Sequence, residues 1–331
     1  MLTKRQNLLE TIHGGNPDRY VNQYEFIQPM VFCNPLAPAP NDLDADGRQK
    51  DDWGVWWQVS GQPGRMPLHD AEHRVVTDIT KWKDQVTPPT GLDNPGIWEP
   101  FAQQMDKIDG NETFRCAGVF PGIWERLHHL CEITTACMNL MIHPKESNEL
   151  LDCIEEYEMN LAEAICKYVK PDALFHHDDW GTQESTFMSD DMFKEFILPR
   201  YQRVYGYYKD HGVELIVHHS DTWGASLVPH MIEMGIDIWQ GALFDTQNIQ
   251  ELVDNYGDKI TIMGGIEDAH IDHEGWTQEE VDDEVDMVLD TVDRKTGFIP
   301  CLTHGLYMSL YDGVYDAISA SIDRRSKIDF A

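Results

Sequence analysis

From about residue 114 onward, short apolar stretches alternate with longer stretches in which apolar residues recur every three or four positions. The short stretches are typical of buried β-strands, and the longer ones are typical of amphipathic helices. One more apolar stretch lies near the start of the chain. The predicted strands are 20–26, 114–120, 172–176, 214–218, 237–240, 259–263 and 297–302.

Strands that alternate with helices predict parallel βαβ units. The helix ends agree with this pattern, because Thr3 with Gln6 and Thr277 with Glu280 have the spacing of capping boxes. We therefore predict an α/β fold, a single (β/α)8 TIM barrel that spans residues 1–331 with a loop-rich N-terminal extension.

The stretch 29–100 interrupts this regular pattern. It is rich in Pro, Gly, Asp and Trp, and a loop of this length inside a compact fold is usually functional or a lid. We expect it to contain the eighth strand and a hairpin at Trp53–Val59. Its tryptophans either pack a loop-rich layer or form a wall for an apolar or aromatic substrate. They are Trp53, Trp56, Trp57, Trp82 and Trp98.

The formal net charge of −33 changes the range of possible partners. It argues against nucleic acid, whose phosphates it would repel, and against a polyanionic substrate. It fits a solvated acidic surface or, alternatively, a basic protein partner. No apolar run is long enough to cross a membrane, and the start of the chain lacks a secretory apolar region. Seven scattered cysteines without a C-x-x-C motif suggest a reducing cytoplasm.

Polar side chains gather where predicted strands end. The stretches 173–184 and 213–223 each run from an apolar strand into two adjacent histidines and then aspartate, and His304 follows the last strand. Barrel enzymes place their chemistry at the carboxyl ends of the strands. We therefore expect these three strand ends to meet at one mouth.

The geometry of a strand limits which of these residues can work together. His218 and Ser220 share one face, His219 and Asp221 share the other, and only one of the adjacent histidines can point into the barrel. Zinc sites that do chemistry use three protein ligands and leave one position open. We predict a bound zinc ion, and its predicted ligands are His218, His304 and Glu184.

We assign catalytic roles to Asp178, Asp179 and His219. Adjacent carboxylates in a cleft can share a proton or bind a cation, although a solvated loop is the alternative. Aromatic rings just past strand ends would line an apolar slot for a ring-shaped ligand. The predicted substrate-binding residues are Phe120, Trp124, Trp180, Gln183 and Tyr307.

Several of these segments together resemble the uroporphyrinogen decarboxylase superfamily of barrels. The resemblance is carried by GVFPGIWERLHHL at 118–130, HHDDWGTQESTFMSDDMFKEFILPRYQRV at 176–204, GVELIVHHSDTW at 212–223 and GFIPCLTHG at 297–305. The decarboxylases of the superfamily carry an Arg-rich N-terminal motif for the porphyrin carboxylates. The corresponding segment here, 22–35, contains no Arg or Lys, which argues against that activity.

The resemblance also implies a second activity, methyl exchange with corrinoid proteins. Thiol-using members of that branch hold zinc with an H-x-C motif and a later Cys. Here these positions correspond to His218-His219-Ser220 and to His304, so both thiolates are missing. The resemblance therefore implies a methyltransferase that moves a methyl group from a small methoxylated donor, such as an aryl methyl ether, to the Co(I) corrinoid of a partner protein. The alternatives are a decarboxylase or lyase of the same superfamily and a non-catalytic binder of a corrinoid or aromatic ligand.

Overall fold

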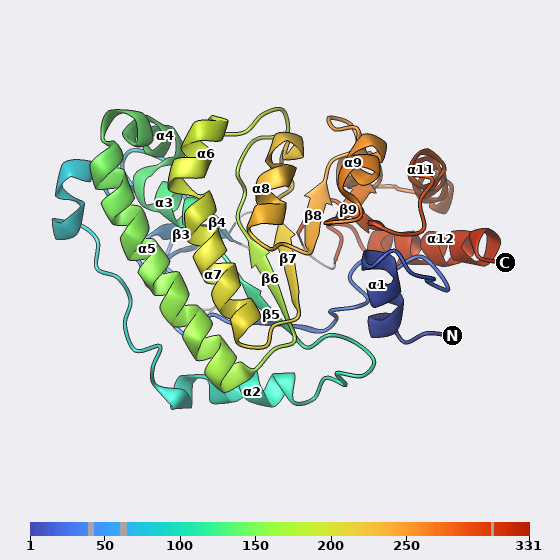
Figure 1. Ribbon diagram of the computed structural model, residues 1–331. Coiled ribbons are helices and arrows are strands. Elements are labelled where there is room, and N and C mark those ends of the chain that lie inside the picture. The colour runs from blue at the N-terminus through green and yellow to red at the C-terminus, as the bar shows by residue number, and fades with distance from the viewer. Residues whose placement is uncertain (39–42, 60–64, 306–307) are drawn as a thin grey trace.

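The computed structural model of the chain describes residues 1–38, 43–59, 65–305 and 308–331. Within these residues, seven parallel strands form one barrel-like sheet, and α5 and α7 are among the helices that cover its outside (Figure 1). The strands lie in chain order: β1 (Met30–Phe32), β5 (Cys116–Val119), β6 (Ala173–His177), β7 (Leu215–His219), β8 (Ile238–Ala242), β9 (Thr261–Ile266) and β10 (Phe298–Leu302).

The helices follow the predicted pattern. Capping boxes are present at Thr3 with Gln6 and at Thr277 with Glu280, as predicted. The helices are α1 (Lys4–Ile12), α2 (Glu99–Met105), α3 (Ile123–Cys131), α4 (Ile133–Ile142), α5 (Pro144–Ala164), α6 (Asp190–Phe196), α7 (Leu198–Asp210), α8 (Val228–Glu233), α9 (Ile249–Tyr256), α10 (Asp268–Ile271), α11 (Gln278–Thr291) and α12 (Val314–Asp329).

The prediction of a first strand at 20–26 is wrong. This segment forms turns, and one side chain and one backbone carbonyl join it to β10 and to the start of β5 instead. The Leu302 amide donates to Gln23 Oε1 at 3.4 Å, and the Phe114 amide donates to the Phe26 carbonyl. The strand expected within 29–100 is present as β1, so the described barrel has seven strands, with residues 20–28 along the remaining seam.

Alternate residues of the strands fill the interior of the barrel. Leu215 and Val217 of β7 point inward, and they pack with inward-pointing residues of the other strands. A second and larger apolar cluster lies between the sheet and the helices. The inward-pointing strand residues are Met30, Cys116, Ala173, Phe175, Leu215, Val217, Ile238, Met263, Ile299 and Cys301.

The stretch 29–100 contains a small antiparallel sheet in addition to β1. Its strands are β2 (Arg48–Lys50), β3 (Trp56–Val59) and β4 (Arg65–Pro67). The predicted hairpin range Trp53–Val59 contains only β3 and part of the turn before it, because the two partners of β3 lie outside that range. Trp53, Trp82 and Trp98 are buried, which confirms the packing interpretation for these three side chains. In the described part of the chain, no helix has the length and apolar character that a membrane crossing requires.

Candidate metal centre at the barrel mouth

Two histidines meet at the carboxyl ends of neighbouring strands. His177 ends β6, His219 ends β7, and the two residues pair in register with ring centroids 4.5 Å apart. His219 continues the inward-pointing series of Leu215 and Val217, so it faces the barrel axis. Together with Asp179, these histidines offer three ligand atoms that all lie within 4.8 Å of one another.

Both imidazoles are oriented by a second polar group. His177 Nδ1 lies 2.9 Å from Glu125 Oε2, in the first turn of α3. The Gln240 amide nitrogen donates to the Leu302 and Thr303 carbonyls at 3.1 and 3.2 Å, which fixes the orientation of the amide. Its oxygen, Oε1, therefore faces His219 Nδ1 and accepts a hydrogen bond from it. This arrangement assigns the proton of His219 to Nδ1 and leaves Nε2 as an acceptor. Such partners are typical of histidines that bind metals.

The charges around these histidines are mostly negative. Burial lowers the pKa of His177, but Glu125 and Asp179 outweigh it and raise that pKa to about 10. Burial and the neighbouring Asp221 raise the pKa of Asp179 well above its usual range. Burial holds the pKa of His219 well below its usual range, so this ring is neutral. A divalent cation would offset the repulsion between these carboxylates.

The donor set fits a zinc-type ion once His177 has lost its proton, because metal binding displaces protons from its ligands. Two imidazoles and one carboxylate make three protein ligands, which is the number that catalytic zinc sites use. Asp221 lies beside them, with Oδ2 3.9 Å from His219 Nε2 and its amide bonded to Asp179 Oδ1 at 3.2 Å. Gly305 packs directly against the His219 ring, because a Cβ atom added at position 305 would lie 2.7 Å from His219 Nε2. No sulfur atom belongs to the group.

Comparison with known proteins identifies the family. The family model described as uroporphyrinogen decarboxylase (URO-D) matches residues 67–311, which is well over half of the chain. The chain belongs to this family.

One solved structure that covers nearly the whole chain supports the fold of this URO-D family member. A methyltransferase from Methanosarcina mazei is 14% identical, with a TM-score of 0.66 over 98% of this chain and 99% of that chain. A D-psicose 3-epimerase solved with D-fructose is 9% identical, with a TM-score of 0.41 over 71% of this chain and 85% of that chain. At 14% identity the first likeness shows the fold alone. A search of curated proteins gives no significant match.

The structure places His218, a predicted zinc ligand, on the outer face of β7. Its Nδ1 lies 2.7 Å from the Tyr205 hydroxyl, its Nε2 lies 3.2 Å from the Asp178 carbonyl, and its ring stacks on Trp180 at 4.0 Å. The side chain is fully buried and supports the wall of the barrel. At this strand end the inward-facing pair is therefore His219 and Asp221. This pair lies one position later in the chain than the pair His218 and Ser220 that the URO-D resemblance implied.

Asp178, to which we assigned a catalytic role, instead binds the start of α3. Its carboxylate accepts hydrogen bonds from the Trp124 and Glu125 amides at 3.0 and 2.7 Å, from Trp180 Nε1 at 2.9 Å and from the Tyr201 hydroxyl at 2.5 Å. Burial, with the nearby Glu125 charge, raises its pKa to about 6. Asp178 thus positions α3, and through it Glu125, which orients His177.

The remaining predicted ligands lie outside the group. Glu184 and Gln183 lie in an exposed turn after β6, where the Glu184 amide is bonded to Thr182. His304 is partly buried; burial lowers its pKa, and the charges of Asp268 and Asp272 act in the opposite direction. The structure therefore does not bring Glu184 and His304 into the group with His177, Asp179 and His219.

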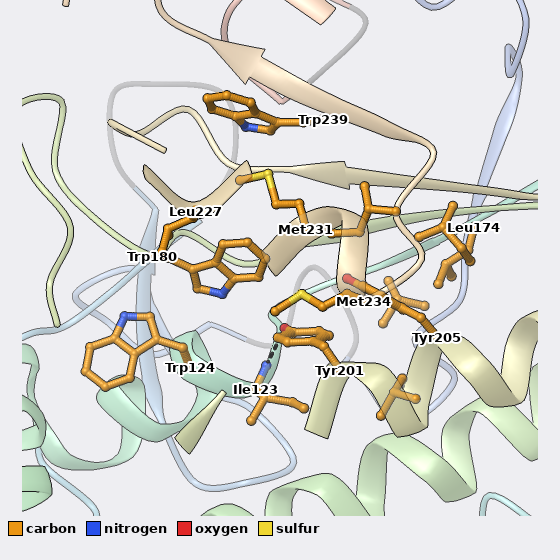
Figure 2. Packing of buried hydrophobic residues seen from close by; sticks show 14 of the residues in the cluster. Ile123, Trp124, Leu174, Trp180, Tyr201, Tyr205, Leu227, Met231, Met234 and Trp239 are labelled. Atoms are coloured by element: carbon orange, nitrogen blue, oxygen red, sulfur yellow. Dashed lines mark hydrogen bonds between the residues drawn. The ribbon is translucent and has the colours of Figure 1, made fainter. Parts of the chain in front are cut away.

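The predicted aromatic slot is largely a packed core. Trp124 and Trp180 are fully buried, and Trp180 lies among Leu227, Met231 and Tyr201 (Figure 2). These two tryptophans therefore hold the barrel wall together. Phe120 is 49% exposed and rests edge-on against Phe32, so among the described aromatic residues of the predicted slot it is the one that remains accessible. Tyr307 lies outside the described residues.

Three residues of the site were not assigned from the sequence. His177 was seen at a strand end but received no role, and Glu125 and Gln240 were not considered. The alternation of β6 contains a usable signal, because Ala173, Phe175 and His177 share the inner face. Glu125 and Gln240 come from distant segments, and only the fold brings them to the histidines.

Proposed function

We propose that this URO-D family member transfers a methyl group from a small methoxylated donor, an aryl methyl ether in the first instance, to the Co(I) corrinoid of a partner protein. The observation that carries the proposal is the inward-facing group of His177, Asp179 and His219. Its ligands are nitrogen and oxygen, and this harder set suits an ether oxygen better than a thiolate.

The residues around the proposed metal site have separate roles. His177, Asp179 and His219 would hold a zinc ion, which when bound supplies a Lewis acid for the ether oxygen. Glu125 and Gln240 keep the two rings in place. The Co(I) corrinoid of the partner would supply the electron pair of the new bond to the methyl carbon, and the ether oxygen would leave with the electron pair of the broken carbon–oxygen bond.

Asp221 is the residue placed to give that oxygen a proton. Burial raises its pKa to about 6, so a protonated fraction is present near neutral pH. A general acid works best when its pKa lies near the working pH. Its Oδ2 lies 3.9 Å from Nε2 of His219, one of the three residues that would hold the zinc ion.

The charge at the mouth supports a small, weakly charged donor. Glu125, Asp179 and Asp221 are all acidic, whereas Arg126 turns away to bond Asp51 at 2.5 Å. A porphyrinogen with many carboxylates would meet repulsion at such a mouth. The charge distribution therefore favours methyl transfer over porphyrinogen decarboxylation.

An anaerobic assay of methylcobalamin formation tests the proposal. Purified protein is mixed with cob(I)alamin and a panel of methoxylated, methylamine and thioether donors. We expect turnover with a methoxylated donor, and about a thousandfold loss in His219→Ala and Asp179→Asn, since removing the Lewis acid should cost several kcal/mol of barrier.

The matched control is His273→Ala, whose side chain bonds the Glu274 carbonyl in the loop after α10. It should keep the wild-type rate. If no donor reacts, the proposed activity is wrong. If a donor reacts but both site variants keep full rates, the activity stands and the role of the metal group is wrong.

A further inference from the structure

A second group of histidines lies away from β6 and β7. His128 and His129 occupy the second half of α3, and His69 follows β4 in the small antiparallel sheet region. The ring centroids of His128 and His129 are 4.6 Å apart, and His69 lies 5.1 and 5.4 Å from them. One ring nitrogen of each residue lies within 4.8 Å of one ring nitrogen of each of the others.

Two of these rings carry a buried nitrogen that the protein does not satisfy. His128 and His129 are only 6% and 7% exposed. The Nδ1 atom of each has no hydrogen-bond partner among the described residues. A buried polar atom without a partner costs about 1–3 kcal/mol, so two in adjacent residues need an explanation. A bound cation would satisfy each Nδ1 atom that serves as the ligand atom of its ring.

The electrostatic environment keeps the rings neutral, which is the form that binds metals. Burial lowers the pKa of His128 to about 3 and holds the pKa of His129 well below its usual range. Burial also lowers the pKa of the more exposed His69. Three neutral imidazoles without a carboxylate or thiolate suit Zn²⁺, Co²⁺, Ni²⁺ or Cu²⁺ rather than Mg²⁺ or Ca²⁺.

We propose that His69, His128 and His129 form a second metal site that binds a divalent transition-metal ion and fastens the small antiparallel sheet region to α3. The backbone already joins the same two regions, because the Val75 and Val76 amides both donate to the Leu130 carbonyl. A metal at the three histidines would add a second tie beside these bonds. This site does not depend on the proposed methyl transfer.

The competing explanation is a cluster of neutral rings that pack without a metal. His129 rests edge-on against Trp57 at 5.1 Å, and His128 lies 5.5 Å from Trp124. Packing of this kind is energetically favourable by itself. This explanation predicts that the three histidines bind no added metal ion, whereas the proposed site predicts that they do.

The test measures Co²⁺ binding by the absorption of the bound ion, on the full chain carrying His219→Ala so that the mouth group is disabled. We expect about one Co²⁺ per chain, displaced by Zn²⁺. Adding His69→Ala should weaken binding at least a hundredfold. His69 is exposed, so its removal should leave the fold intact. The matched control is His73→Ala, four residues away and paired with Asp70 at 2.7 Å, which should bind normally.

A second measurement separates a metal tie from packing. In hydrogen exchange, added Zn²⁺ should slow the amides of residues 65–76 in the His219→Ala chain and leave them unchanged when His69→Ala is also present. Absence of Co²⁺ binding in the His219→Ala chain would overturn the proposal. Equal binding with and without His69 would also overturn it.

Discussion

A single buried carboxylate, Asp178, joins β6 to the first turn of α3. Two backbone amides, an indole and a phenol all donate to it, and it has no exposure to solvent. We expect Asp178→Ala to lower the free energy of unfolding by about 3–5 kcal/mol, because four buried donors lose their acceptor. Urea denaturation followed by circular dichroism measures this change.

The control for this prediction is Asp191→Ala. Asp191 is an exposed acidic residue in the first turn of α6, and its removal should cost less than about 1 kcal/mol. A loss for Asp178→Ala no larger than that of the control would show that the donors find other partners.

The choice between adjacent histidines shows how much the sequence can predict at the residue scale. Alternation establishes that His218 and His219 point in opposite directions, but the resemblance to thiol-using methyltransferases selected His218. The apolar series Leu215, Val217, His219 would have indicated the other choice, because it matches the inner face of the barrel. The partners of His219, by contrast, depend on contacts between segments far apart in sequence.

At the scale of elements, α4 begins at an unusual cap. Glu132 has φ 71°, and its carboxylate accepts from the Thr134 and Thr135 amides, each at 2.9 Å. Burial raises the pKa of Glu132, but these donors outweigh it and lower the pKa to about 2. The cap therefore stabilises the fold fully above the unfolded pKa, and this contribution is lost as the pH falls through about 2.

We expect Glu132→Ala to cost about 1 kcal/mol near pH 7, as other helix caps do. The difference from the wild type should shrink as the pH falls below about 4. Glu132→Gln is the matched control, because an amide keeps one acceptor oxygen but cannot titrate in this range. Urea denaturation at a series of pH values provides the measurement, and a difference that does not change with pH would contradict the role of the charge.

The elements with local signals were predictable. Capping residues define α1 and α11, and buried apolar runs define the strands from β5 to β10 within a few residues. The segment 20–26 misled the prediction because its apolar residues are as buried as those of a strand. It satisfies its polar groups through side chains and turns instead, and a single sequence does not distinguish these cases.

At the scale of the whole molecule, the net charge of −33 opposes folding. Like charges repel more strongly in the compact chain than in the unfolded chain, and salt screens this repulsion. We expect the melting temperature to rise by several degrees as NaCl increases from about 0.01 M to about 0.5 M, where the Debye length falls severalfold. Differential scanning fluorimetry measures this shift.

Sucrose at matched osmolality is the control, because it separates charge screening from general solute exclusion. A melting temperature that NaCl leaves unchanged, or lowers, would mean that the ion pairs of the surface compensate for the excess of acidic groups. The fold class of the whole molecule was predictable from the alternation of elements, whereas the seven-strand closure was not.

The seam of the barrel can close only late in the synthesis of the chain. Gln23 and Tyr24 bond to Leu302 and His304, partners that lie 279 and 280 residues later in the chain. On the ribosome, these contacts must wait until nearly the whole chain has emerged, since distant contacts form late. Until then the apolar side chains of residues 20–28 have no barrel interior to enter, and they remain available to chaperones or to aggregation.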